Sequence, residues 1–201
     1  MRRKTFDMIL TAGGAVLVVV LLAAGGLGLW GYSFANSNVH NQLAQQQITF
    51  PPRAAFAHAK VGTEIEPVMI PYIEKYAGQP LTTGQQAEAY ADHFIAYHLQ
   101  EIGGGKTYAQ LSAASIADPT NTKLAGQVET VFKGTTLRGL LLEAYAFWTF
   151  GQIALVASIV SFVLAGLMLV LTLIGVVHLR RVPEDQEFPK AHTVDKVPVT
   201  V

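Results

Sequence analysis

The sequence predicts an all-α membrane protein in which two transmembrane helices bracket a small helical extracytosolic domain. Two long apolar runs without charge, residues 8–30 and 153–177, predict the spans. Between them, apolar residues recur at three- and four-residue spacing, which is typical of helices with one buried face. The expected division is a cytosolic N-terminus at 1–7, a first transmembrane helix at 8–34, an extracytosolic domain at 35–146, a second transmembrane helix at 147–178 and a disordered cytosolic tail at 179–201.

Composition supports this class. Of 201 residues, 51% are hydrophobic and only 14% are charged, whereas a soluble domain has about 25% charged residues. The 14 basic and 14 acidic residues balance, so the chain has no basic surface typical of nucleic-acid binding. The absence of cysteine excludes disulfides, iron–sulfur clusters and thiolate zinc sites.

The first apolar run, Met8 to Trp30, is long enough for a span. As a helix it measures roughly 34 Å, against a hydrocarbon core of about 30 Å. A cleaved signal peptide is the alternative, because Ser33-Phe34-Ala35 loosely resembles a small-x-small cleavage site. Cleavage would leave a singly anchored protein with the same domain.

Flanking residues predict the orientation. Arg2, Arg3 and Lys4 precede the first span, and Arg180 and Arg181 follow the second. The positive-inside rule therefore places both termini in the cytosol and residues 35–146 outside the plasma membrane. Aromatic residues mark one common outer interface at the end of the first span and the start of the second: Trp30, Tyr32, Phe34, Tyr145, Phe147, Trp148 and Phe150.

The central segment should be helical with almost no sheet. Residues 36–48 continue the first span as a polar helix, and Pro51-Pro52 ends it. Residues 49–81 should be irregular because prolines and glycines interrupt them. A helix over residues 83–102 carries one buried stripe, formed by Ala87, Tyr90, Ala91, Phe94, His98, Leu99 and Ile102.

Helix signals continue to the second span. Gly103-Gly104-Gly105 ends the helix, and Thr107 with Gln110 forms a capping box for a helix to about Ile116. Asp118-Pro119 starts a third helix, striped by Leu124, Val128, Val131 and Phe132. Another helix should run from Thr135 into the second span, with Leu137, Leu140 and Leu141 packed on the 83–102 stripe.

Three clusters could carry chemistry, but each has a simpler structural interpretation. Gly105-Lys106-Thr107 resembles the end of a phosphate loop, yet Gln100 stands where that loop needs glycine. His93, His98 and Glu101 suggest an iron site, but the two histidines lie about 140° apart on one helix. A further ligand would have to come from elsewhere, and the candidates are His40 and His58. Glu88 and Asp92 could act as an acid–base pair, although a solvated acidic face is the commoner arrangement.

Small residues in the spans favour close helix packing, although the glycine and alanine content of the spans explains them equally well. Gln152 could also form a hydrogen bond between helices. The small residues are Ala157, Ser161 and Ala165 on the second span and Gly14, Gly25 and Gly28 on the first.

Three stretches carry a family resemblance: Leu43–Pro52, Tyr76–Tyr108 and Gly134–Tyr145. Together they resemble a group of actinobacterial two-span membrane proteins of unknown function. Members often carry the automatic label "aromatic ring-opening dioxygenase LigA". Because those dioxygenases resemble soluble cytosolic enzymes and no facial triad can be placed here, we expect the label to be an inherited error. The resemblance supplies no catalytic residues.

The sequence therefore predicts a non-enzymatic integral membrane protein whose extracytosolic domain binds a partner protein, a lipid or an envelope component. We assign no catalytic, cofactor-binding or metal-binding residues, and expect no cofactor. The expected partners are the lipid bilayer and either a protein or a second copy that associates through the spans, and no nucleic acid. The contact surface should comprise exposed aromatics and residues 49–81. The alternatives are the labelled enzyme and a transport or sensor accessory.

Overall fold

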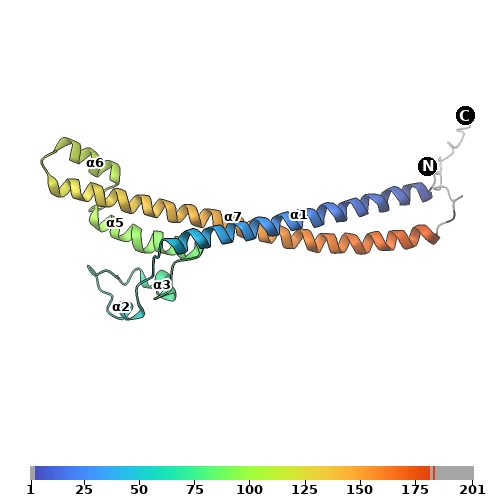
Figure 1. Cartoon of the computed structure of the whole chain (residues 1–201), viewed down its shortest axis with the longest axis horizontal. Helices are drawn as coiled ribbons and strands as arrows, with labels where there is room; N and C mark the ends of the chain where they lie inside the picture. The colour runs from blue at the N-terminus through green and yellow to red at the C-terminus, as the bar shows by residue number, and fades with distance from the viewer. Residues whose placement is uncertain (1–2, 182, 184–201) are drawn as a thin grey trace, which may run out of the picture. The chain divides into compact units, whose positions relative to one another are not determined.

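The computed structural model describes residues 3–181 and residue 183, and in these residues the fold is helical. Two helices, α1 (Arg3–Gln45) and α7 (Thr122–Arg181), are long and apolar enough to cross a membrane (Figure 1). No strand forms within the described ranges, where one isolated bridge joins Thr49 and Pro80. The prediction of an all-α chain with two helices that could span a membrane is confirmed.

The chain divides into two compact units, to which both long helices contribute. Within the described residues, the helix-pair unit comprises residues 3–28 and 156–181, and the domain unit comprises Leu29–Leu155. In the helix-pair unit the large apolar side chains point outward, so that Leu10 is 65% exposed and Leu27 is 70% exposed. Such a continuous apolar surface suits lipid rather than water. The residues buried between the two helices are small or β-branched: Gly14, Val18, Gly25, Ser158 and Ala165.

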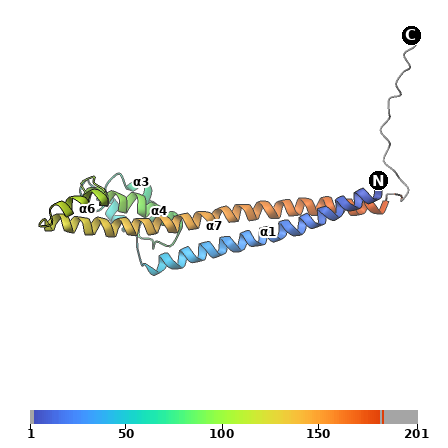
Figure 2. The ribbon, with the colours of Figure 1, turned by 90° about the horizontal axis from the view of Figure 1, so that it is seen from above.

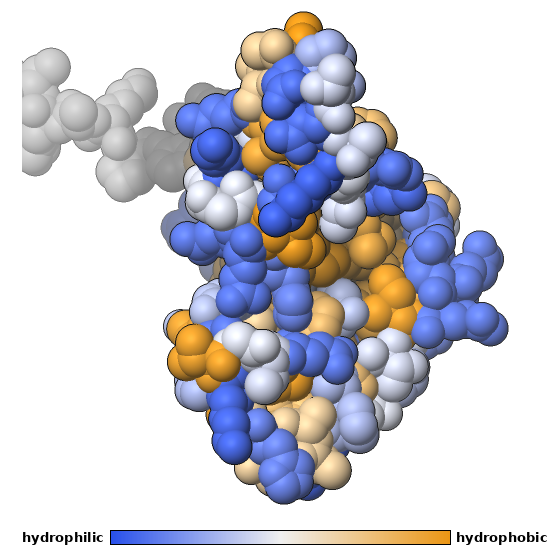
Figure 3. Space-filling view, turned by 90° about the vertical axis from the view of Figure 1, so that its left-hand side faces the viewer, coloured by the Kyte–Doolittle hydropathy of each residue, from blue (hydrophilic) through white to orange (hydrophobic). Residues whose placement is uncertain are grey.

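The domain unit surrounds one apolar core. Between the long helices lie α2 (Arg53–Ala57), α3 (Ile70–Ile73), the 3₁₀-helix η1 (Glu74–Tyr76), α4 (Gly84–Tyr90), the π-helix η2 (Ala91–Ile95), α5 (Ala96–Ile102) and α6 (Tyr108–Ala117). Helices α5 and α6 run beside the first half of α7 (Figures 1 and 2). Figure 3 looks onto the end of this unit that holds α6, where polar side chains cover most of the surface and apolar groups show in a hollow between them.

The segment 49–81 differs from the prediction. It forms three short helices rather than only irregular chain, and it supplies a large part of the core. This burial is possible because Phe50 N donates to Gln79 O and Leu81 N donates to Ile48 O, which ties the two ends of the segment together. Its buried apolar side chains are Phe50, Phe56, Ile65, Met69, Ile73 and Leu81.

The predicted 83–102 helix is present as α4, η2 and α5 in direct succession. A capping box of Thr83 and Gln86 starts it. The π-helical turn at Ala91–Ile95 was not predicted, and it widens the helix in its middle. Ala87 and Ala91 are fully buried as expected, whereas Ile102 is 37% exposed, so the predicted stripe is wrong at its last position.

The signals that end and start the next helices are confirmed. Gly104 and Gly105 have positive φ angles after α5, a conformation that glycine adopts without steric cost. The Thr107–Gln110 capping box then begins α6. Asn121, which follows the Asp118-Pro119 turn, accepts a hydrogen bond from Leu124 N through its side chain and caps α7.

Three predictions about α7 are wrong. The third helix and the helix from Thr135 are one continuous helix, Thr122–Arg181. A Cβ at Gly134 would collide with the Leu99 side chain, so this glycine permits close approach of α5. Leu141 is buried as expected, but Leu140 is 58% exposed and does not join the core. Helix α7 also continues through Arg181, so residues 179–181 are not a disordered tail, and the rest of that prediction lies outside the described residues apart from Pro183.

Candidate functional site: a groove between α1 and α7

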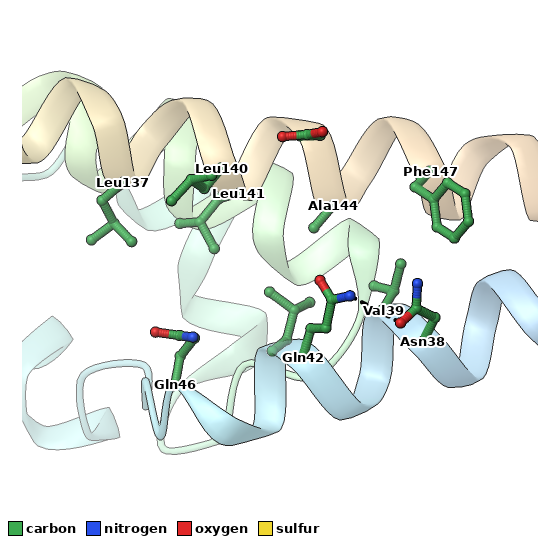
Figure 4. Close-up of a pocket in the computed structure, with 11 residues that line it drawn as sticks. Asn38, Val39, Gln42, Gln46, Leu137, Leu140, Leu141, Ala144 and Phe147 are labelled. Atoms are coloured by element: carbon green, nitrogen blue, oxygen red, sulfur yellow. Dashed lines mark hydrogen bonds between the residues drawn. The ribbon is translucent and has the colours of Figure 1, made fainter.

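A groove of about 470 Å³ lies between α1 and α7 in the domain unit (Figure 4). Its floor consists of Val39 and Leu43 from α1 and Leu141 from α7, which are buried to 4% exposure or less. Because these floor residues belong to the core, the groove is part of the packed fold. Its walls are rows of side chains on the two helices, which Figure 4 shows facing one another across the gap.

The α7 wall is apolar. Leu137, Leu140, Ala144 and Phe147 follow one another at spacings of three, four and three residues. That spacing places them on one face of a helix, as in the seam of a coiled coil. Leu140 is 58% exposed and Phe147 is 37% exposed, although apolar positions at this spacing are normally covered. Part of the row is packed, because Ala144 lies against the core and the Phe147 ring meets the Phe34 ring edge-on at 6.3 Å. Leu140 is the most exposed member of the row.

The α1 wall is built from side-chain amides. Asn38, Gln42 and Gln46 lie four residues apart, and Gln42 Nε2 donates to Asn38 Oδ1 at 2.9 Å. The bond orients both amides along the helix. Glu143 is the charged residue that lines this groove. One apolar wall, one amide wall and a single carboxylate can receive an amphipathic helix, in which leucine-type residues face α7 and polar residues face α1.

The side chains weighed as iron ligands do not converge. The His93 ring stacks on Tyr72 with a centroid distance of 3.6 Å and an interplanar angle of 5°. His98 Nδ1 lies 2.7 Å from Phe94 O, and its ring is half-buried. Across the described residues, no three His, Asp or Glu side chains are placed to hold one metal ion. The two histidines therefore have structural partners of different kinds.

The other two clusters also have structural roles. Asp92 forms an ion pair with Arg138 Nη2 at 2.5 Å, so the prediction of a merely solvated Glu88–Asp92 face is wrong for Asp92. This pair links η2 to α7. Gly105-Lys106-Thr107 follows helix α5 rather than a strand, and Thr107 caps α6.

A buried carboxylate in the 49–81 segment was missed in the sequence. Glu66 is 2% exposed and accepts hydrogen bonds from Tyr97 Oη at 2.5 Å and from Gly62 N at 2.7 Å. Both hydrogen bonds lower the pKa of Glu66, and the bond from Tyr97 has the larger effect. The same bond, with burial, raises the pKa of Tyr97 to about 12. A local pattern could not reveal this pair because 31 residues separate its members.

In the helix-pair unit, glycines pack against hydroxyl-bearing side chains. A Cβ at Gly14 would lie 2.7 Å from Thr172 Oγ1, and a Cβ at Gly175 would lie 2.8 Å from Thr11 Oγ1. Each helix thus places a threonine on a glycine of the other. The expected packing role of Gly14 is confirmed.

The hydrogen bond between the two helices comes from Ser158, which donates to Gly25 O, rather than from Gln152. Gly25 therefore packs as expected. Ala165 is buried, but Ala157 is exposed, so the predicted stripe on the second span is partly wrong.

Comparison with known proteins identifies no relative of this chain. No protein-family model, curated protein or solved structure matches the chain. The functional conclusion therefore rests on the chemistry of the groove and of the apolar helices.

Proposed function

We propose that this protein is an integral membrane protein that binds one amphipathic helix of a membrane-protein partner in the groove between α1 and α7. In this proposal both termini are cytosolic and residues 35–146 are extracytosolic in the plasma membrane. Lys4 and Arg3 before the apolar part of α1, and Arg180 and Arg181 at the end of α7, support that orientation. The resemblance to actinobacterial two-span membrane proteins agrees with it, and membership of that group is part of the proposal.

One observation carries the proposal: the apolar row on α7 is regular, yet Leu140 at its centre is 58% exposed and Leu137 and Phe147 are only partly covered. Fully burying a leucine or phenylalanine side chain is worth about 1.5–3 kcal/mol. A helix placed on Leu137, Leu140 and Phe147 would gain part of this for each residue, without a change in the core beneath. The exposed row is also too regular to be scattered surface apolar residues, which need no explanation.

The charge of the groove favours a different protein over a second copy. Glu143 lies at the groove, and no Lys or Arg lines it. A two-fold dimer would bring the same patch from both chains together. Its carboxylates would then meet only amides and apolar groups. A partner helix with a lysine or arginine beside its leucine seam would pair with Glu143, so that chemistry defines the proposed partner.

The enzymatic alternative has no supporting observation in the described residues. The candidate ligands His93 and His98 have other partners, and Glu101 lies near the Glu66–Tyr97 pair. The binding function is therefore the one that the geometry favours.

Photocrosslinking in native membranes tests the proposal. A photoreactive amino acid at position 140 should crosslink to one membrane protein, within a helical segment that bears a basic residue. The same group at Ile116, which is 78% exposed on α6, is the control and should not capture that protein. Leu140→Arg should abolish recovery of the partner, whereas Ile116→Arg should preserve it. Crosslinks from position 140 to a second copy alone, or to lipid alone, would refute the proposed partner.

The orientation has a separate test, because the chain contains no cysteine. Single cysteines at Ser37, Thr120 and Thr5 can be treated with a membrane-impermeant thiol reagent on intact cells. Labelling of positions 37 and 120 but not of position 5 is expected. Labelling of position 5 would overturn the assignment of a cytosolic N-terminus.

A further inference from the structure

A second groove lies in the helix-pair unit, between the N-terminal part of α1 and the C-terminal part of α7. It has a volume of about 780 Å³. Its sides are apolar and include Leu10, Leu17, Leu171 and Ile174. Asp7 and His178 lie at one end of it. The groove is therefore amphipathic along its length, with a long apolar part and a polar end.

Its length matches one leaflet of a bilayer. The lining residues extend from Asp7 to Leu17 on α1 and from Met168 to His178 on α7. Ten residues of helix rise about 15 Å, which is half of the hydrocarbon core of about 30 Å. A single lipid acyl chain of one leaflet, with its headgroup at the polar end, fits this length.

The polar end holds a carboxylate oxygen that needs a donor. Asp7 Oδ2 is buried and accepts no hydrogen bond from the described residues. His178 Nε2 lies 3.8 Å from it, which is beyond hydrogen-bond distance. Thr172 Oγ1, which also lines the groove, is buried and has no hydrogen-bond partner in the same described part of the chain. A buried carboxylate is costly unless a donor or a cation accompanies it.

The headgroup that satisfies Asp7 Oδ2 carries a primary ammonium and a phosphate. A primary ammonium has N–H donors for Asp7 Oδ2, whereas a quaternary ammonium has none. The last turn of α7 presents His178, Arg180 and Arg181, which suit the phosphate. A serine headgroup would add a carboxylate close to Asp7, so charge disfavours it.

We propose that the groove between Asp7–Leu17 and Met168–His178 binds one phospholipid with a primary-ammonium headgroup, such as phosphatidylethanolamine. The inference rests on the membrane assignment within the proposed function but is independent of the partner helix. Asp7 and His178 recognise the headgroup, and the interhelical groove holds one acyl chain.

Native mass spectrometry of the full chain in detergent tests this proposal. The protein is titrated with dioleoylphosphatidylethanolamine or dioleoylphosphatidylcholine. One ethanolamine lipid should bind about tenfold more tightly than the choline lipid, as expected for one hydrogen bond to a charged group. Asp7→Asn should remove most of this preference. Equal affinity for both lipids in the wild type, or an unchanged preference in Asp7→Asn, would overturn the assignment of the headgroup.

A pair of glycine variants tests the groove itself. A Cβ at Gly13, which lines the groove, or at Gly26, which does not, would meet no atom within 4 Å. Gly13→Leu should fill the groove and weaken lipid binding at least tenfold, and Gly26→Leu is the matched control that should bind normally. If Gly13→Leu binds lipid normally, the site is wrong. If it instead converts a lipid-free dimer to a monomer, a second copy occupies the groove and the proposal fails.

Two controls separate this proposal from the proposed function. Circular dichroism in the same detergent checks that each variant is helical. Leu140→Arg should lose the partner protein but keep the lipid preference, because Leu140 belongs to the other groove. A missing lipid preference together with normal crosslinking at position 140 would refute the lipid site alone.

Discussion

The Ser158 hydroxyl donates a hydrogen bond of 2.6 Å to the carbonyl oxygen of Gly25, and it joins the two long helices at a buried point of the helix-pair unit. A helix carbonyl already accepts one backbone hydrogen bond but retains a second lone pair. Access to that lone pair requires close approach of the helices, which Gly25 permits because a Cβ there would lie 2.8 Å from the Phe162 ring. The pairing thus explains why a glycine and a serine lie opposite each other in apolar helices.

Ser158→Ala should weaken the association of the two helices by about 0.5–1.5 kcal/mol, the usual value of an interhelical hydrogen bond in a membrane. Ser161→Ala is the matched control, because Ser161 Oγ donates to Ala157 O within its own helix. It should change stability by less than Ser158→Ala. Reversible unfolding in mixed micelles containing sodium dodecyl sulfate, followed by circular dichroism, measures the difference. Equal losses in both variants would show that the interhelical bond adds no stability.

Replacing glycine by alanine should lower the stability of the protein at a packed position and raise it at an open position. A Cβ at Gly84 would collide with Trp148, so Gly84→Ala should force α4 away from α7 and cost about 1–3 kcal/mol. Gly139 lies on α7 with nothing within 4 Å of an added Cβ. Gly139→Ala should therefore stabilise the protein by up to about 1 kcal/mol through helix propensity. Thermal unfolding of the two purified variants gives the sign directly, and stabilisation by Gly84→Ala would contradict the packing.

Local chemistry made much of the fold predictable. The two long apolar helices follow from long runs without charge. The Thr107–Gln110 capping box and the glycines after α5 are decided within a few residues. The buried face of the second span was also visible, since Gly151, Ser158, Ala165 and Thr172 recur every seven residues. The predicted stripe, which began at Ala157, followed only the four-residue spacing and missed this repeat.

Features that depend on distant contacts could not be predicted. Nothing in the sequence around Gly134 indicates that the Leu99 side chain packs against it. Leu140 and Leu141 are alike in sequence, yet one is 58% exposed and the other is 2% exposed, because only Leu141 faces the core. The groove became visible only after α1 and α7 were paired. Leu137 and Leu140 of its apolar wall were predicted to pack in the core, Phe147 to mark the membrane interface, and the amide wall to be a plain polar helix.

Two aromatic residues allow the core to be tested. Phe50 is 1% exposed, and its ring lies 5.1 Å from that of Tyr76 and 5.3 Å from that of Tyr90. Phe50→Ala should destabilise the protein by about 3–5 kcal/mol. Phe94 is only half-buried, so Phe94→Ala should cost roughly half as much. Denaturant unfolding in detergent compares the two variants. A larger loss for Phe94 would show that the 83–102 stripe, and not the 49–81 segment, dominates the core.

The pairing of Glu66 with Tyr97 should make stability depend on pH at both extremes. The pKa of Glu66 is lowered in the folded protein, first by the Tyr97 hydrogen bond and then by the Gly62 bond. The stability that ionised Glu66 gives the folded protein is therefore fully present above its pKa in the unfolded chain, about 4.3. This stability is lost as the pH falls through the lower pKa of Glu66 in the folded protein. The pKa of Tyr97 is raised from 10.0 to about 12, first by the bond to Glu66 and then by burial. The stability that the protonated Tyr97 phenol gives the folded protein is complete below pH 10 and is lost as the pH rises toward 12.

Tyr97→Phe separates this pair from the other groups that titrate. The variant lacks the phenol, so the loss of stability between pH 10 and 12 should shrink, and the acid loss should shrink because the pKa of Glu66 moves back toward its ordinary value. Tyr108→Phe is the control, since Tyr108 is 39% exposed on α6 and its ring lies tilted against the Phe132 ring, at a centroid distance of 5.4 Å. The midpoint of thermal unfolding, measured from pH 3 to 12 for all three proteins, gives the difference curves. Parallel curves for the wild type and Tyr97→Phe would show that the hydrogen bond does not couple the segment 49–81 to α5. A curve that is flatter at both pH extremes in Tyr97→Phe, and not in Tyr108→Phe, would establish this coupling.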